Sequence, residues 1–134
     1  MTLWMRLLVA FVIFCHGFIY IRVGSMLPGP IKEWRGSSWL LGSVVTGDRL
    51  TLLVIGLHVI AGTATIAGAL AIGFAPSVPG WWRPLAIIGG ALGVTAFAVF
   101  WDGQIQLLFE EGGIGALVSL VLLGTAILSP AACR

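Results

Sequence analysis

The chain has 134 residues, of which 59% are hydrophobic and 9% charged, and its formal net charge is +2. Ordinary soluble domains carry about 45–50% apolar and about 25% charged residues. A chain this small exposes too much of its surface to hide such an excess from water. The composition therefore excludes a soluble enzyme and a disordered segment. It also excludes a nucleic-acid binder, which needs clustered Lys and Arg. The sequence predicts a single integral membrane domain over residues 1–134.

The first apolar run predicts a transmembrane helix over residues 3–22, about the length that crosses a bilayer. Arg6 followed by apolar residues imitates a signal peptide, but no small-x-small cleavage site follows within the run. The bulky Phe14 just before Cys15 also argues against lipoprotein processing. We therefore expect the segment to stay attached. Cys15 and Cys133 show no redox or disulfide pattern and are predicted to be unpaired small apolar side chains.

A long connection from Gly24 to Arg49 separates the first two apolar runs. Pro28 and Pro30 prevent a continuous helix there. Residues 38–45 are too apolar for a free loop and too short to cross a membrane. With its tryptophans, the connection is expected to lie along the membrane surface at the level of the headgroups, where indole rings prefer to sit.

Three more apolar runs predict spans over residues 50–74, 82–101 and 114–128, and Pro130 ends the last one. Lipid offers no partners to backbone polar groups, so each span must be helical. The second and third connections are short. The predicted fold class is therefore all-α, a four-transmembrane-helix up-down-up-down bundle with a long first loop lying at the membrane surface.

Small residues are frequent in the second and third runs, where Gly89 and Gly93 form a small-xxx-small pair. Such residues let helix backbones approach closely in lipid, where the hydrophobic effect does not drive helices together. We expect this packing to occur within one chain, with a dimer face as the alternative. Both termini are expected in the cytoplasm, although the distribution of Lys and Arg over the loops does not favour this orientation.

Ionisable side chains inside a membrane are the first place to look for function. Asp102, Glu110 and Glu111 fall at the ends of predicted spans, where water reaches them. They are candidate polar residues of the membrane interface, and Glu110 and Glu111 precede a helix whose positive dipole end favours them. A small proton-coupled transporter needs a carboxylate deep in the bilayer, and the predicted spans hold none, so a transporter is the last alternative.

His16 and His58 are the remaining ionisable candidates. At about 1.5 Å of rise per residue, they lie roughly 9 Å and 12 Å below the same membrane side. An antiparallel pair of helices therefore brings both rings to a similar depth. Tyr20 shares a face with His16, and Gly62 and Thr65 share a face with His58. These five residues form the candidate ligand-binding set.

Three interpretations of this set remain open. In the first, each imidazole stays neutral and bonds a neighbouring helix or water. In the second, His16, Tyr20 and His58 bind the headgroup of a quinone or a small lipid. In the third, His16 and His58 ligate a haem, because neutral imidazole is a natural iron ligand, and Gly17 and Gly62 leave space for a flat cofactor. No catalytic triad, phosphate-binding loop or zinc spacing is present, so no catalytic residue and no other metal ligand is predicted.

The run from Arg6-Leu7-Leu8 to His16-Gly17-Phe18, together with the four-span layout, resembles the DoxX-like group of small bacterial membrane proteins. The resemblance implies a multi-pass protein of the bacterial inner membrane with a His-Gly feature late in its first helix. It also implies association with quinol oxidase or sulfur-oxidation complexes. We therefore expect an accessory or structural subunit of a quinol-linked redox assembly, without catalytic activity of its own. Its partners would be the bilayer and other membrane subunits or a second copy, and no nucleic acid.

Overall fold

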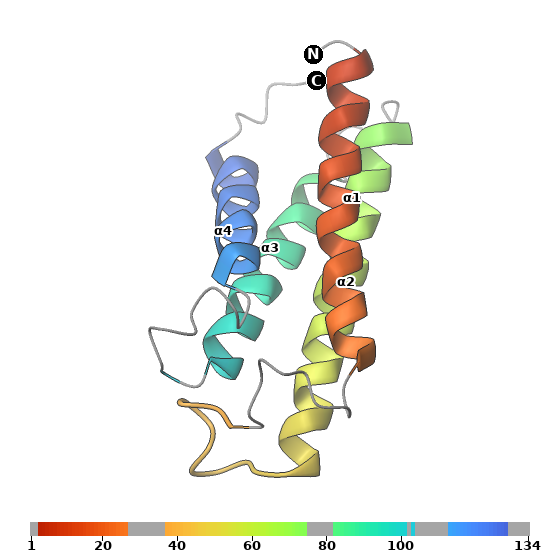
Figure 1. Cartoon of the computed structure of the whole chain (residues 1–134). Coiled ribbons are helices and arrows are strands. Elements are labelled where there is room, and N and C mark those ends of the chain that lie inside the picture. Colours follow the sequence, from red (N-terminus) through yellow and green to blue (C-terminus); the bar gives the residue numbers. More distant parts are fainter. Residues whose placement is uncertain (1–2, 27–36, 75–81, 102, 104–112, 129–134) are drawn as a thin grey trace.

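The computed structural model describes residues 3–26, 37–74, 82–101, 103 and 113–128. These residues form an all-α fold with four helices: α1 (Leu3–Met26), α2 (Asp48–Phe74), α3 (Trp82–Phe100) and α4 (Gly113–Leu128). Successive helices run in opposite directions, so the start of α1 and the end of α4 lie at the same end of the molecule (Figure 1). The predicted all-α class and its four helices are confirmed.

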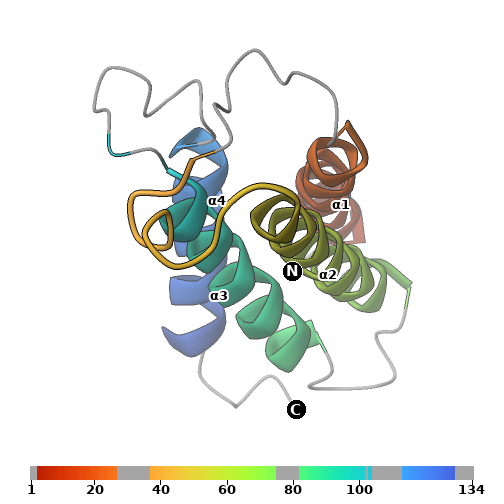
Figure 2. The same cartoon turned by 90° about the horizontal axis from the view of Figure 1, so that it is seen from below.

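The helices pack in series, α1 on α2, α2 on α3 and α3 on α4. Figure 2 shows this order along the helix axes, with α1 and α4 at the two ends of the series. Helix α1 ends at Met26, beyond the predicted end at residue 22. Helix α2 begins at Asp48, just before the predicted start at residue 50.

Three of the described helices are long and apolar enough to cross a membrane: Leu3–Arg22 within α1 (20 residues), α2 (27 residues) and α3 (19 residues). Helix α4 has 16 residues, which gives a length of about 24 Å. The hydrocarbon core of a bilayer is about 30 Å thick. The structure therefore has three helices of spanning length and one shorter apolar helix.

Large apolar side chains are exposed on every helix. Phe11 of α1 is 64% exposed, Leu52 of α2 67%, Ile88 of α3 47% and Val121 of α4 67%. A soluble monomer rarely exposes contiguous apolar surface of this kind. The outer faces of the helices are therefore suited to contact with the hydrocarbon of a bilayer.

Glycines make the contacts between successive helices close. At the crossing of α1 and α2, a Cβ built on Gly62 would lie 2.6 Å from the carbonyl oxygen of Gly17. On α3, a Cβ on Gly89 would lie 2.5 Å from Oγ1 of Thr65, and one on Gly90 would lie 2.9 Å from the carbonyl oxygen of Ser119. The small residues therefore pack helices of the same chain against one another.

The segment before α2 caps the end of α3. The Trp39 backbone N–H donates to the Trp101 carbonyl (3.1 Å), its indole N–H donates to the Ala98 carbonyl (2.5 Å), and the Ser38 hydroxyl donates to the Val99 carbonyl. Ala98 and Val99 belong to the last turn of α3 and Trp101 directly follows it, so these carbonyls have no partner within the helix. Two side chains of the same segment pack on the core between α2 and α3: Leu41 and Val45. The segment predicted to lie at the membrane surface thus closes a helix end.

Candidate functional site

A polar cluster joins the two ends of the helix series. His16 and Tyr20 lie one turn apart on the inner face of α1, and each is 8% exposed. Ser119 of α4 is 1% exposed, and its hydroxyl oxygen lies 3.1 Å from Nε2 of His16 and 2.9 Å from the hydroxyl of Tyr20. One serine hydroxyl therefore bonds two side chains of another helix. We call these three residues the α1–α4 polar cluster.

His58 of α2 extends the cluster through ring contacts. Its ring centroid lies 5.6 Å from that of Tyr20, and the Tyr20 ring lies 5.0 Å from that of His16. The His58 ring also contacts the ring of Phe100, with a centroid distance of 5.4 Å. Nδ1 of His58 lies 2.9 Å from the Val54 carbonyl oxygen. Because a carbonyl only accepts, Nδ1 carries a proton, and in the neutral form of the ring Nε2 is the acceptor.

Two glycines give the cluster its space. A Cβ on Gly93 of α3 would collide with the Ser119 hydroxyl and would lie 2.6 Å from the Tyr20 hydroxyl oxygen. A Cβ on Gly115 of α4 would lie 3.8 Å from Cε1 of His16. Gly93 therefore lets α3 approach the point where α1 and α4 meet, which the spacing of Gly89 and Gly93 alone did not indicate.

The candidate ligand-binding set divides into two groups. His16, Tyr20 and His58 come together as described. Gly62 lies at the backbone contact with Gly17, and Thr65 packs against Gly89 of α3 while its hydroxyl donates to the carbonyl of Ala61 at 2.8 Å. Gly62 and Thr65 therefore lie at the contacts of α2 with α1 and α3.

The sequence interpretation missed Ser119, whose hydroxyl takes part in both hydrogen bonds of the cluster. A serine in the middle of an apolar run is a usable signal, because hydroxyls inside lipid bond neighbouring helices. The predicted interface residues Asp102, Glu110 and Glu111 lie outside the described residues, as does Cys133.

Two contacts of His16 and His58 conflict with the haem interpretation. Tyr20 contacts both imidazole rings, and Nε2 of His16 is bonded to Ser119. A haem ligated by both histidines would have to displace the phenol ring and break that bond. Within the described part of the chain, no three His, Cys, Asp or Glu residues gather as a metal site.

No protein-family model, curated protein or solved structure matches the chain. What the structure defines is a four-helix all-α protein with three long apolar helices.

Proposed function

We propose that the chain is a multi-pass protein of the bacterial inner membrane that serves as an accessory or structural subunit of a larger membrane assembly. One observation carries the proposal: the α1–α4 polar cluster bonds within itself, through Ser119. A catalytic group has to be reachable by a substrate, whereas a structural tie is buried with its polar atoms paired inside the protein, and His16, Tyr20 and Ser119 are only 8%, 8% and 1% exposed. The cluster has the second property.

The outer surfaces support a role within an assembly. Helix α1 and helix α4 end the series and each packs closely on one neighbour. On α4, apolar side chains point outward, with Leu117 56% and Leu120 49% exposed. In this proposal α4 is the fourth span, both termini are cytoplasmic, and partner helices or lipid cover these faces. The resemblance to the DoxX-like group suggests that the assembly is quinol-linked.

The test is mild detergent extraction of native membranes that contain the tagged protein, followed by native electrophoresis and absorbance spectroscopy. We expect a complex well above the 14.1 kDa chain, with quinol-oxidising activity or cytochrome absorbance from the co-purified subunits. The same tag on an unrelated inner-membrane protein is the control. Recovery of the chain alone, or of partners equally abundant in the control, would rule out the subunit role.

A second function, binding of a quinone headgroup, is favoured by the contact of one phenol with two imidazoles. A quinone carbonyl needs a hydrogen-bond donor, which the Tyr20 hydroxyl can supply. A quinol hydroxyl needs an acceptor, which Nε2 of His58 can supply. The test is the quinone content of purified protein compared with that of the His16→Ala/His58→Ala double variant. Loss of quinone in the double variant supports this function, and equal content in both rejects it.

A further inference from the structure

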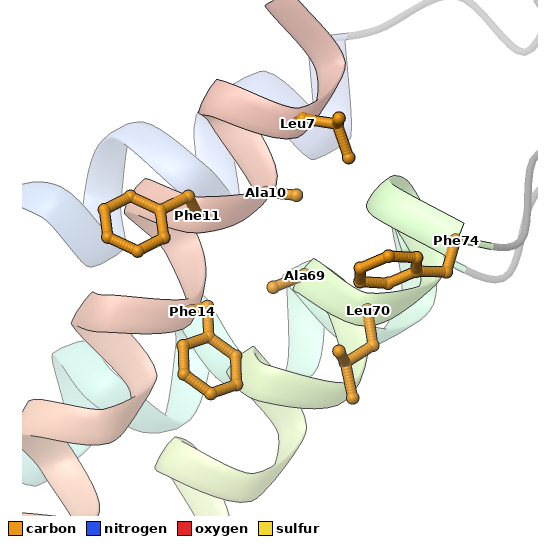
Figure 3. Close-up of a pocket in the computed structure, with 7 residues that line it drawn as sticks. All are labelled: Leu7, Ala10, Phe11, Phe14, Ala69, Leu70 and Phe74. Carbon is orange, nitrogen blue, oxygen red and sulfur yellow. The ribbon is translucent and has the colours of Figure 1, made fainter. Parts of the chain in front are cut away.

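An apolar groove lies between the start of α1 and the end of α2 (Figure 3). It has a volume of about 360 Å³, within the range of about 300–1,000 Å³ found for ligand pockets. Every side chain that lines it is apolar: Leu7, Ala10, Phe11, Phe14, Ala69, Leu70 and Phe74. The groove therefore suits a hydrocarbon ligand.

The groove exists because small residues form its floor and large ones its walls. Ala10 is 7% and Ala69 2% exposed, so both lie at the helix contact. Phe14, Leu70 and Phe74 are 38%, 45% and 77% exposed and rise above them. From Leu7 to Phe14 the wall on α1 follows the helix for about 10 Å. A narrow site of this length, open along one side, fits a chain and not a compact headgroup.

Arg6 stands at the outer end of the groove. It directly precedes Leu7 and lies one turn before Ala10, and both of these residues line the groove. Its Nε is buried without a hydrogen-bond partner. A buried donor on a cation that lacks a partner is costly, and a phosphate or carboxylate removes the cost. Arg6 also lies near the start of the first spanning segment, Leu3–Arg22, which is the depth of lipid headgroups.

We propose that this groove binds an acyl chain of an anionic phospholipid from the bilayer and that Arg6 binds its phosphate. The guanidinium offers a planar fork of donors that matches phosphate oxygens. The apolar walls lead from this charge toward the middle of α1 and so follow the chain of a lipid whose headgroup is at Arg6. The site does not depend on the polar cluster or on the proposed subunit role.

The experiment is native mass spectrometry of the purified full chain in detergent, titrated with phosphatidylglycerol or phosphatidylcholine of the same acyl chains. We expect about fivefold tighter binding of phosphatidylglycerol, which corresponds to about 1 kcal/mol for one basic residue at an anionic membrane surface. Arg6→Gln should remove this preference. Arg22→Gln removes the same charge at the other end of the span and should keep it.

The groove is tested with a matched pair of phenylalanines on α1. Phe14 lines the groove, and Phe18, one turn later and 55% exposed, is not among the lining residues. Phe14→Ala should weaken binding of both lipids severalfold and preserve the ratio between them, while Phe18→Ala should change neither. Helix content by circular dichroism verifies that each variant is folded. Equal affinity of the unaltered chain for both lipids, loss of preference in both arginine variants, or equal weakening by both phenylalanine variants would overturn the proposal.

Discussion

Helix α1 contacts its two partners in different ways. Against α2, the backbones of Gly17 and Gly62 approach each other without a polar side chain between them. Against α4, His16 and Tyr20 reach one hydroxyl, that of Ser119. The first contact depends on residues without side chains, and the second depends on polar side chains.

The difference shows two ways in which neighbouring helices can hold α1. Neither way needs the hydrophobic effect, which does not drive helices together in lipid. Close packing gains dispersion energy along a contact surface and tolerates no added atom, whereas a polar contact concentrates its energy in a few bonds at one depth. We therefore expect the α1–α2 contact to be more sensitive to added volume and the α1–α4 contact to the loss of single polar atoms.

The largest effect is expected from Gly62→Ala. The added methyl would lie 2.6 Å from the Gly17 carbonyl oxygen, which belongs to backbone and cannot move aside alone. Overpacking of this kind lowers the free energy of unfolding by about 1–3 kcal/mol. The matched control is Gly56→Ala on the same helix, where nothing lies within 4 Å of the new Cβ. Unfolding in mixed micelles of rising dodecyl sulfate fraction measures both. Equal stability of the two variants would contradict the close-packing interpretation.

Ser119→Ala is expected to have the next largest effect. It removes the common partner of His16 and Tyr20 and leaves both side chains buried. Hydrogen bonds between membrane helices contribute about 1–2 kcal/mol in model peptides, and we expect a loss in this range in the same unfolding assay. Ser43→Ala, in the exposed turn before α2, serves as the control. If both serine variants unfold alike, the cluster does not hold α4 to α1.

Tyr20→Phe should have a smaller effect, because it keeps the ring and its contacts with both histidines and removes only the hydroxyl. We expect about 0.6 kcal/mol, the average measured for such bonds in a membrane protein. In the background of Ser119→Ala the same change should cost less, since the two groups share one bond. Full additivity of the two substitutions would show that they act independently.

The smallest effect is expected at the end of α4. Arg83 of α3 donates from Nε to the Ala126 carbonyl (2.7 Å) and from a terminal nitrogen to the Ile127 carbonyl (3.0 Å). A cation at a helix C-terminus contributes about 0.3–1 kcal/mol. In Arg83→Met, amide hydrogen exchange in the last turn of α4 should become faster while exchange around Ser119 stays unchanged. Unchanged exchange in the last turn would show that the arginine does not cap the helix.

The sequence predicts the helices well because each apolar run is long and its ends are marked by Pro, Gly or charged residues. It also places His16 and Tyr20 together, since residues four apart share a helix face. It does not single out Ser119, and it does not show that Gly62 and Thr65 contact α1 and α3, because periodicity defines a face and does not say which helix meets it. Residues 38–45 show the same limit: their apolar character predicts a segment lying at the membrane surface, but their role at the end of α3 depends on tertiary contacts.

The bonds from Ser38 and Trp39 to the last turn of α3 connect an early part of the chain with a late one. During translation, Ser38 and Trp39 are synthesised before the carbonyls at the end of α3 that accept their hydrogen bonds. The turn at 39–44 can therefore reach its final partners only after the third helix has been synthesised. In a chain that stops before α3, these donors would have to bond water, so the turn takes its final place only once α3 is present.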